Sequence, residues 1–380
     1  MKYIDEFRDG KLAQAIGAAI RREVDPARQY NLMEFCGGHT HAIARYGLPD
    51  LLPRNVRMIH GPGCPVCVLP VGRIDNAIEI AAQPNVILCS FGDTLRVPAS
   101  GQMSLLKAKA RGSDIRMVYS SLDAVAIAQQ NPDRQVVFFA IGFETTTPTT
   151  AVAVKKAEAL GLLNFSVFCN HVLTPAALDA ILATDDTGGP QTLVHGVVGP
   201  AHVSTVIGSA PYEAFTIRYR KPLVIAGFEP LDVLQAVRML VRQLNEGRAE
   251  VENEYTRTVT REGNRKAQAM VEDMFELRPS FEWRGLGEVP WSALQLRERY
   301  RQFDAEARFK VEKRTVADAK ACECGTILRG LKEPKDCKIF GTVCTPENPV
   351  GACMVSSEGA CAAYFTYGRF TIPIKEMTAS

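Results

Sequence analysis

Between about residues 30 and 230 the chain repeats one pattern: a short apolar run, a glycine-containing loop and a stretch with helical periodicity. Because buried apolar strands alternate with helices in βαβ units, the pattern predicts parallel sheets covered by helices. We expect an α/β fold with two Rossmann-like sheets that divide near residues 143–150. The predicted strands are 31–35, 56–60, 85–91, 135–143, 165–170, 193–199 and 222–228.

The remaining segments are predicted to be largely helical. Apolar residues near helical spacing predict an amphipathic helix over 4–25 and helices over 150–161 and 231–247. The charged stretches 249–275 and 294–310 predict two polar helices, joined by the irregular connector FEWRGLGEVPW. A chain of 380 residues accommodates two or three domains. The expected units are an N-terminal helix, 1–30, two α/β domains, 31–145 and 146–230, and a helical, cysteine-rich domain, 231–380.

Composition excludes several classes of protein. The formal net charge is only +2, and no clustered basic stretch marks a nucleic-acid surface. The longest apolar runs, such as 136–143, are too short to span a bilayer, and the N-terminal residues contain no apolar signal core. Eleven cysteines in a chain without an export signal indicate a reducing compartment, where thiols bind metals or undergo redox reactions. We therefore expect a cytoplasmic protein.

Six of these cysteines lie in the last 59 residues, and four follow the pattern C-x14-C-x6-C-x16-C at Cys322, Cys337, Cys344 and Cys361. Four thiolates are the usual ligand set of a zinc ion or an iron–sulfur cluster. The spacing is that of neither a zinc ribbon nor a bacterial ferredoxin. A 4Fe–4S cluster, a structural zinc ion, and cysteines that pack as small apolar residues are the three interpretations. Cys324 and Cys353 are left over, and beside a cluster we expect them to form a redox disulfide.

Most of the unusual local sequences begin where a predicted strand ends, and in open parallel sheets ligands bind at that edge. CGGHTH places Cys36, His39 and His41 within six residues, which suits a nucleophile or metal ligand with an acid–base partner. The alternative is a glycine-rich turn around a buried cysteine. GPGCPVC holds Cys64 and Cys67 at the spacing of a redox dithiol, or of half a zinc site. We expect these motifs in the cleft between the two α/β domains.

Two further motifs place a polar residue directly after an apolar run. Glu144 in GFETT is predicted either to transfer protons or orient a ligand, or to cap the following helix with its threonines. His202 in GPAHVS has the same two interpretations. Residues inside the apolar runs are expected in the core, with the two histidines either packing there or supporting a ligand: His60, His195, Cys89 and Cys169.

Taken in order, CGGHTH, GPGCPVC, GFETT, PAHVS and the four-cysteine pattern resemble the HypD family of hydrogenase maturation factors. The resemblance runs from about residue 30 to the C-terminus, and five ordered motifs make it specific. It implies a scaffold, bound to a HypC-like chaperone, on which the Fe(CN)2CO unit of NiFe hydrogenase is assembled. Cyanide would arrive from a HypE-like carrier that holds it as a thiocyanate.

The resemblance also implies roles for single residues. Cys36 would hold the iron, and Cys64 and Cys67 would form a redox pair beside it. The cysteine pattern would carry a 4Fe–4S cluster that supplies electrons. His41 and Glu144 would supply protons or orient the incoming group. We expect a redox-active scaffold that is monomeric on its own, rather than a conventional turnover enzyme.

Two other functions agree with parts of the sequence. A stand-alone iron–sulfur and dithiol disulfide reductase explains the C-x-x-C spacing and the cysteine block, but leaves CGGHTH without a role. The other interpretation is a nucleotide-binding α/β protein with a structural metal domain. It lacks both a G-x-x-x-x-G-K-S/T loop and a strand followed by G-x-G-x-x-G.

Overall fold

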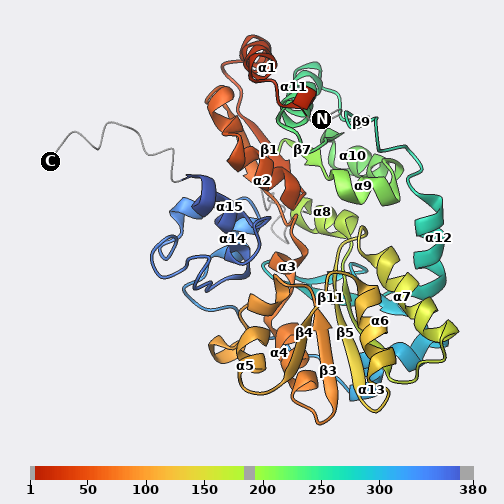
Figure 1. The fold of residues 1–380 in the computed structure, drawn as a ribbon. Coiled ribbons are helices and arrows are strands. Elements are labelled where there is room, and N and C mark those ends of the chain that lie inside the picture. Colours follow the sequence, from red (N-terminus) through yellow and green to blue (C-terminus); the bar gives the residue numbers. More distant parts are fainter. Residues whose placement is uncertain (1–4, 184–192, 369–380) are drawn as a thin grey trace.

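The computed structural model describes residues 5–183 and 193–368, and it confirms an α/β fold with two parallel sheets. Sheet A, the upper one in Figure 1, has the strand order β2 (Val56–His60), β1 (Tyr30–Glu34), β7 (Gly196–Gly199), β8 (Leu223–Ile225) and β9 (Val251–Asn253). Sheet B, below it, has the order β4 (Asp114–Met117), β3 (Val86–Ser90), β5 (Gln135–Gly142) and β6 (Phe165–His171). All neighbouring strands within the two sheets are parallel.

Sheet B is buried on both faces, and successive residues of β5 enter different cores. Val137 and Phe139 belong to the core that includes side chains of α4 (Val71–Ala81) and α5 (Leu105–Ala110). Val136 and Phe138 belong to the core that includes side chains of α6 (Ser121–Gln130) and α7 (Thr147–Ala159). The continuous apolar run in the sequence therefore corresponds to a strand with helices on either side.

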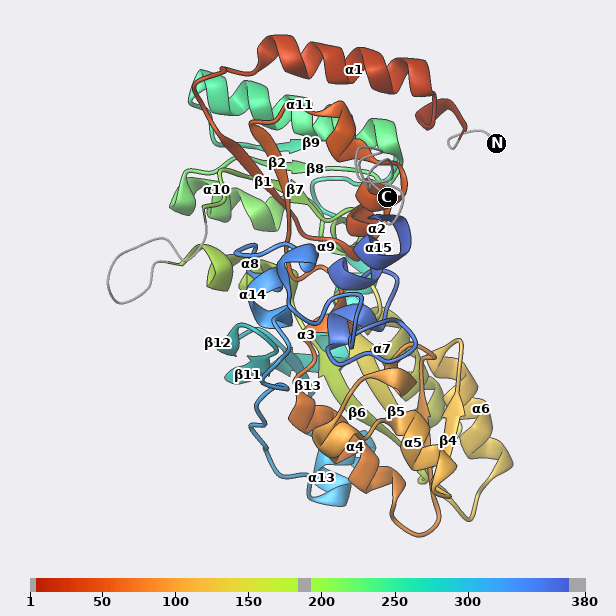
Figure 2. The ribbon, with the colours of Figure 1, turned by 90° about the vertical axis from the view of Figure 1, so that its left-hand side faces the viewer.

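On sheet A, α1 (Gly10–Glu23) and α11 (Pro230–Glu246) lie side by side at the top of Figure 2. Asp9 caps α1 by accepting hydrogen bonds from two backbone amides of its first turn. Glu23 at the other end pairs with Arg242 and Arg238 of α11, and these guanidinium groups lower the pKa of Glu23 to about 2. The helix predicted over 4–25 is confirmed for residues 10–23.

The other α-helices of the described residues are α2 (Gly37–Arg45), α3 (Pro65–Val68), α8 (Thr174–Leu182), α9 (Ala201–Ile207), α10 (Glu213–Tyr219), α12 (Arg265–Met274), α13 (Ala305–Phe309), α14 (Cys324–Leu328) and α15 (Ala360–Tyr367). Short 3-10 helices are η1 (Asp5–Phe7), η2 (Leu48–Leu51), η3 (Thr94–Arg96), η4 (Ser100–Gln102), η5 (Ala210–Tyr212), η6 (Glu298–Phe303), η7 (Pro334–Asp336) and η8 (Ala352–Met354). Among the described helices, none has the length and apolar character that crossing a membrane requires.

The two sheets do not divide the chain near residues 143–150, so that expectation is wrong. The chain leaves sheet A after β2, forms all four strands of sheet B, and returns to sheet A with β7, which pairs with β1. An apolar run shows that a strand is buried but not which strand lies beside it, and the local pattern therefore missed the return. The division into independently folding domains stays a prediction, because sheet membership does not define folding units.

The two polar helices predicted over 249–275 and 294–310 are also wrong for most of their length. The first stretch contains β9 and only one helix, α12, and the second retains the short η6 and α13. Between and beside them, β10 (Phe275–Leu277) pairs with β13 (Leu294–Leu296), and the predicted connector is a hairpin of β11 (Ser280–Trp283) and β12 (Gly287–Pro290). Phe275, Leu294 and Leu296 are buried in the core of sheet B. Burial in the folded core, rather than the spacing of charged residues, therefore determines the secondary structure of these stretches.

The expected domain of 231–380 stays a prediction, although α11 and β9 within it pack with sheet A. Residues 311–368 form an irregular unit with short helices, the character that was expected of the C-terminal region. This C-terminal unit contacts both α/β parts of the molecule. Its α15 packs beside α2 of the sheet A part (Figure 1). From the sheet B part, Arg96 donates hydrogen bonds to Pro346 O at 3.1 Å and to Val355 O at 2.6 Å.

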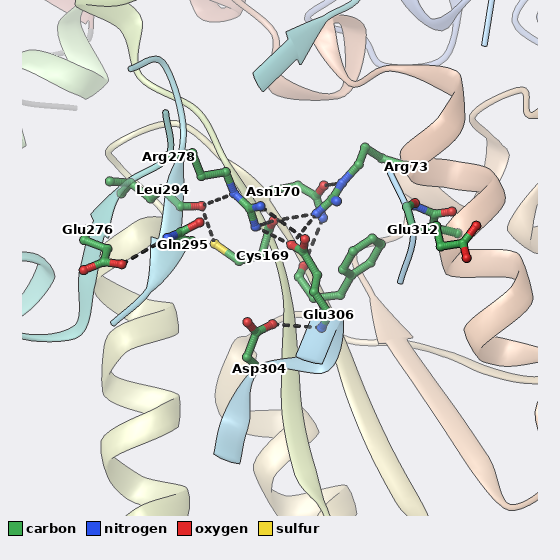
Figure 3. A network of polar contacts seen from close by, with 12 residues as sticks. Arg73, Cys169, Asn170, Glu276, Arg278, Leu294, Gln295, Asp304, Glu306 and Glu312 are labelled. Atoms are coloured by element: carbon green, nitrogen blue, oxygen red, sulfur yellow. Dashed lines mark hydrogen bonds and ion pairs between the residues drawn. The ribbon is translucent and has the colours of Figure 1, made fainter. Parts of the chain in front are cut away.

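A largely buried ion network holds α13 against sheet B, and Figure 3 shows its residues converging. Glu306 of α13 accepts a hydrogen bond from Arg73 of α4 at 2.7 Å and pairs with Arg278. Arg73 also donates to Cys169 O of β6 at 3.0 Å. Burial alone would raise the pKa of Glu306, but the two guanidinium groups lower it to about 2. The network thereby anchors the segment that leads into the C-terminal unit.

We predict that Glu306→Gln destabilises the fold by about 3 kcal/mol at neutral pH, because two largely buried guanidinium groups lose their counter-ion. Since folding lowers the pKa of Glu306, its contribution is complete above the ordinary value of 4.5 and is lost as the pH falls toward about 2. Urea denaturation at pH 7 and at about pH 3.5 should show the difference from wild type shrinking at the lower pH.

The control is Glu298→Gln, which removes an exposed ion pair with Arg301 and should leave stability unchanged within error. Equal effects of the two substitutions would contradict the anchoring role of Glu306.

Candidate functional site

Three of the motifs follow three neighbouring strands of sheet A. CGGHTH follows β1, GPGCPVC follows β2 and GPAHVS follows β7, and β1 lies between the other two strands in the sheet. Because the strands are parallel, the three loops leave the sheet at the same edge. GFETT follows β5 of sheet B. The prediction that the motifs stand at strand ends is confirmed.

Cys36 is the N-cap residue of α2, and its side chain makes no capping hydrogen bond there. The backbone amides of Gly38 in α2 and of His202 in α9 act to lower its pKa, because N–H groups near a sulfur favour the thiolate. Burial, Glu358 and Glu34 act in the opposite direction and raise the pKa of Cys36 to about 12. Cys36 is therefore a neutral thiol at neutral pH until a cation takes the place of its proton.

Glu34, in the last position of β1, organises the loop that holds Cys36. Its carboxylate is fully buried. It accepts hydrogen bonds from Cys36 N at 3.0 Å, from Thr40 Oγ1 and from His60 Nδ1, which is 2.8 Å away. Because His60 ends β2, one carboxylate links the Cys36 loop to the loop of GPGCPVC. His60 therefore supports the Cys36 loop indirectly, through its hydrogen bond to Glu34.

These two loops also touch through glycine positions. Gly37 N donates to Gly63 O at 3.0 Å, and a Cβ on Gly63 would lie 2.5 Å from Cys36 N. A Cβ on Gly37 would lie 2.4 Å from the Cβ of Glu358. Side chains at either position would force the loops apart, so glycine is required here by close approach.

His39 binds the loop that follows β8. Its Nε2 lies 3.0 Å from Ala226 O and 2.9 Å from Gly227 O, so we assign the ring proton to Nε2, which donates to these carbonyls. The ring of Phe228 lies 5.1 Å from that of His39 and 4.1 Å from that of His202, between centroids. Burial lowers the pKa of both histidines, which favours their neutral forms.

A cavity of about 330 Å³ borders the CGGHTH loop, and its lining includes Gly38, His41, Phe228 and Glu358. His41 is half-buried, and the hydroxyl of Tyr367 in α15 lies 3.3 Å from its Nε2. Glu358 belongs to the C-terminal unit, and burial together with neighbouring carboxylates raises its pKa. The C-terminal unit therefore contributes a helix and an acidic side chain to the surroundings of Cys36.

A series of thiol contacts leads from GPGCPVC into the C-terminal unit. Cys67 is fully buried, its Sγ donates to Ala352 O at 4.0 Å, and Cys353 and Cys64 are its neighbouring thiols. Burial and these contacts raise the pKa of Cys67 well above that of a free thiol. All eleven cysteines are free thiols in the structure. The predicted redox pair of Cys64 and Cys67 is thus in contact, and Cys353 continues the series.

Within the C-terminal unit, Cys324 is the central thiol. Cys322, Cys353 and Cys361 are its neighbouring thiols, so the predicted pair of Cys324 and Cys353 lies close together. Hydrogen bonds from Cys324, Cys361 and Cys67 lower the pKa of Cys353 well below the ordinary value.

The cysteine block is compatible with a metal or iron–sulfur cofactor in its donor chemistry, because thiolates are the usual ligands of such groups. A Cβ on Gly351 would lie 2.3 Å from Cys322 Sγ and 2.5 Å from Cys324 Sγ, so the backbone carries no side chain where the sulfurs gather. Cys344 Sγ accepts a hydrogen bond from Val350 N at 3.4 Å, and bonds of this kind tune clusters. The four ligands stay a prediction: Cys322, Cys337, Cys344 and Cys361.

A single metal ion requires three or more ligating side chains that converge on one point. In residues 5–183 and 193–368, no group of three or more His, Cys, Asp or Glu side chains is arranged to hold a metal ion.

Glu144 is buried and accepts hydrogen bonds from Thr174 N at 2.9 Å and from Thr174 Oγ1 at 3.1 Å. It therefore caps α8 rather than α7, the helix that follows it in sequence. Burial raises the pKa of Glu144 to about 7, a value suited to proton transfer at neutral pH. Tyr212 of η5 is fully buried, which raises its pKa, and its hydroxyl lies 3.4 Å from Ser204 Oγ of α9.

The other residues from the apolar runs pack as expected. Cys89 and Cys169 are buried in β3 and β6, and burial raises their pKa values to about 12 and about 11. His195 is half-buried, and its Nδ1 accepts a hydrogen bond from Asn31 N at 3.0 Å. It thereby joins the residue before β7 to β1.

Sequence reasoning missed Glu34, Glu358 and Phe228. Glu34 carried a signal, because it is the one charged residue of the apolar run 31–35. A carboxylate in a strand buried on both faces must find donors, and this marks it as a structural centre. Glu358 carried no comparable signal, since its position depends on how distant segments pack. Phe228 lies in GFEP (227–230), an unusual sequence at the end of a predicted strand, but its contacts with His39 and His202 were not predicted.

Comparison with known proteins relates nearly the whole chain to one family. A family model for HypD, described as hydrogenase formation hypA family, matches residues 11–368. The chain is 67% identical over 369 residues to the hydrogenase expression/formation protein HupD of Azotobacter chroococcum mcd 1, and the match covers 97% of each chain. It is 66% identical over 371 residues to the hydrogenase maturation factor HypD of Cupriavidus necator, covering 97% of this chain and 98% of that one. With the HypD of Escherichia coli K12 it shares 47% identity over 372 residues, at the same coverage.

We predict that Glu34→Ala lowers the free energy of unfolding by about 3 kcal/mol, because buried donors on Cys36, Thr40 and His60 lose their acceptor. Glu34→Gln keeps an acceptor oxygen of similar shape and should lose less. Urea denaturation should therefore rank the proteins as wild type, Gln variant, Ala variant. The rate at which iodoacetamide alkylates Cys36 should rise in the same order as the loop loosens. Equal stability of the wild type and the Ala variant would rule out the organising role of this carboxylate.

Proposed function

The chain belongs to the HypD family, and we propose that it is a hydrogenase maturation factor on which the Fe(CN)2CO unit of a NiFe hydrogenase is assembled. The names of its relatives, which refer to hydrogenase formation or maturation, support the general assignment. The observation that carries the finer proposal is the position of Cys36. It lies where three motif loops leave one sheet edge, beside a dithiol whose Cys67 contacts the cysteine-rich C-terminal unit.

In this proposal, iron is the cargo and Cys36 is its protein ligand. A soft thiolate suits iron that also carries cyanide and CO. The amides of Gly38 and His202 favour the thiolate form of Cys36. Glu34 and Glu358 add negative charge near the sulfur, which favours a cation in place of the proton. One cysteine leaves the other coordination positions open for the diatomic ligands and for a partner.

The cysteines of the C-terminal unit would hold a 4Fe–4S cluster through Cys322, Cys337, Cys344 and Cys361. Such a cluster supplies electrons one at a time when it is bound. Cys324 and Cys353 stand between these ligands and Cys67, and the thiol contacts support a short route for electrons to the Cys64–Cys67 pair.

The dithiol matches the electron demand of cyanide release. A thiocyanate R–S–CN and two thiols give R–SH, HCN and one disulfide, so the S–C bond breaks as an S–S bond forms. Oxidation of Cys64 and Cys67 would supply both electrons and both protons. A cluster held in the C-terminal unit would pass on two electrons, one at a time, from an external one-electron donor, and two protons from water would complete the return to the dithiol. Glu144, whose pKa burial raises to about 7, and His41 at the nearby cavity are the candidates for moving protons.

We propose two protein partners. A HypC-like chaperone would share the iron with Cys36 through its own cysteine, and a HypE-like carrier would present the thiocyanate. The cavity of about 330 Å³ is lined by Gly38 and His41 of the CGGHTH loop, which supports the approach of a partner to this loop. We propose that the protein acts in the cytoplasm as a monomer that binds these partners, and that nucleic acid and membranes play no part.

A dithiol disulfide reductase is the second candidate. The contact between Cys67 and Cys353 favours it, since thiol–disulfide exchange requires such contact. A reductase would turn over a disulfide substrate without a partner. A scaffold would instead retain iron together with its chaperone.

We predict that Cys36→Ala removes the cyanide and CO infrared bands from the protein when it is purified anaerobically with its HypC-like partner from cells that mature hydrogenase. The visible absorption of the cluster should stay, because Cys36 is outside the cysteine block. Cys89→Ala, in the core of sheet B, is the matched control and should keep both signals. Bands that persist in the Cys36 variant would remove this residue as the iron ligand.

We predict that Cys344→Ala loses the visible cluster absorption and lowers the thermal stability of the protein, because cluster binding and folding of the C-terminal unit are coupled. Absorption spectroscopy and calorimetry on anaerobic protein measure the two effects, again with Cys89→Ala as the control. An absorption spectrum identical to that of wild type would show that the four-cysteine assignment is wrong.

A further inference from the structure

A second cavity, of about 560 Å³, lies between the sheet B part and the C-terminal unit. Its walls come from the η4–α5 segment, the β11–β12 turn and residues 317–319 and 343–350. The charged side chains of the lining are Arg96, Lys107, Arg284, Asp318 and Glu347. This cavity belongs to none of the motif loops.

Arg284 is the unusual residue of this lining. It is only 4% exposed, and its backbone N donates to Val68 O at 2.8 Å, which fixes it behind the GPGCPVC helix. Within the described part of the chain, its Nε and one terminal nitrogen have no hydrogen-bond acceptor. Asp318 Oδ1 lies 3.1 Å from Nε and balances the charge, but it is not aligned to accept a hydrogen bond. A buried guanidinium group with unused donors is costly unless an acceptor fills the space.

Arg96 and Lys107, the other two cations of the lining, differ in how firmly protein contacts hold their side chains. Both terminal nitrogens of Arg96 donate to backbone carbonyls, so its position is fixed by the protein. Lys107 is exposed on α5 and donates to Gln102 O, a contact that water or a ligand can replace. Arg284, buried in the lining, and Lys107, exposed on α5, are therefore the two cations of the lining that protein acceptors do not fully engage.

We propose that this cavity binds a small oxyanion, a phosphate or a carboxylate, with Arg284 as the buried anchor and Lys107 as the second contact. Guanidinium groups bind such oxyanions through parallel N–H donors, and the volume lies within the usual range of small-molecule sites. The proposal does not depend on the proposed function.

The position of the cavity gives the ligand a structural role. Residues 317–319 lead into Cys322, and Val343 of the lining directly precedes Cys344. An anion held there bridges the η4–α5 segment to the two chain segments that carry these cysteines. Binding should therefore raise the melting temperature of the full-length protein.

The test is isothermal titration calorimetry of the full-length anaerobic protein with sodium phosphate and, separately, with sodium succinate. Sodium chloride keeps the ionic strength constant, so that screening does not imitate binding. We expect one of the two anions to bind with one-to-one stoichiometry, and which one binds identifies the ligand class. Lys107→Ala should weaken binding about tenfold, the effect of losing one charge-assisted hydrogen bond.

Lys109→Ala is the matched control, because Lys109 is exposed on the same helix and does not line the cavity. It should bind the anion as tightly as wild type. Arg284→Gln should abolish binding, and if that variant does not fold, the two lysine variants decide. No binding of either anion to the wild type would overturn the proposal, as would equal weakening by both lysine substitutions.

Discussion

The Cys36 site depends on the buried carboxylate of Glu34. An ionised group shielded from water is stable only when donors surround its oxygens. Here the donors come from the places that the site must join: the Cys36 amide, the first turn of α2 and His60 at the end of β2. The requirement that stabilises the carboxylate therefore also sets the separation between the loops of Cys36 and Cys64. The close glycine contacts between these loops are possible only at that separation.

The C-terminal unit is linked to this arrangement at two separate points. Glu358 lies against Gly37 and acts on the charge of Cys36, while Cys353 contacts Cys67. One unit thus influences both the sulfur proposed to hold iron and the dithiol proposed to supply electrons. Arg96 and the network around Glu306 keep the unit and the segment before it in place. A shift of the C-terminal unit would therefore change the surroundings of Cys36 and of the Cys64–Cys67 pair at the same time.

Local patterns predicted much of the fold and less of the site. The strand at 56–60 was predicted to the residue, because its apolar run is bounded by a turn and a glycine. Strand pairing was not, since nothing near Leu32 indicates that Gly196 lies beside it. The charged surroundings of Leu294 and Leu296 suggested a helix, and only burial against sheet B makes them a strand. At the site, cysteines and histidines were recognised from their chemistry. Phe228 and Glu358, which join the site by long-range packing, were not.

The return of the chain to sheet A has a consequence for the order of folding. Asn31 and His195 are hydrogen-bonded although 164 residues separate them. During synthesis, β1 and β2 emerge long before β7, the strand that completes their sheet, and sheet B is translated in between. Cys36 and Cys64 are therefore synthesised well before the sheet around them can close, because β7 begins only at Gly196. A nascent chain of this topology must rely on the reducing power of its surroundings to keep both thiols intact until the sheet closes.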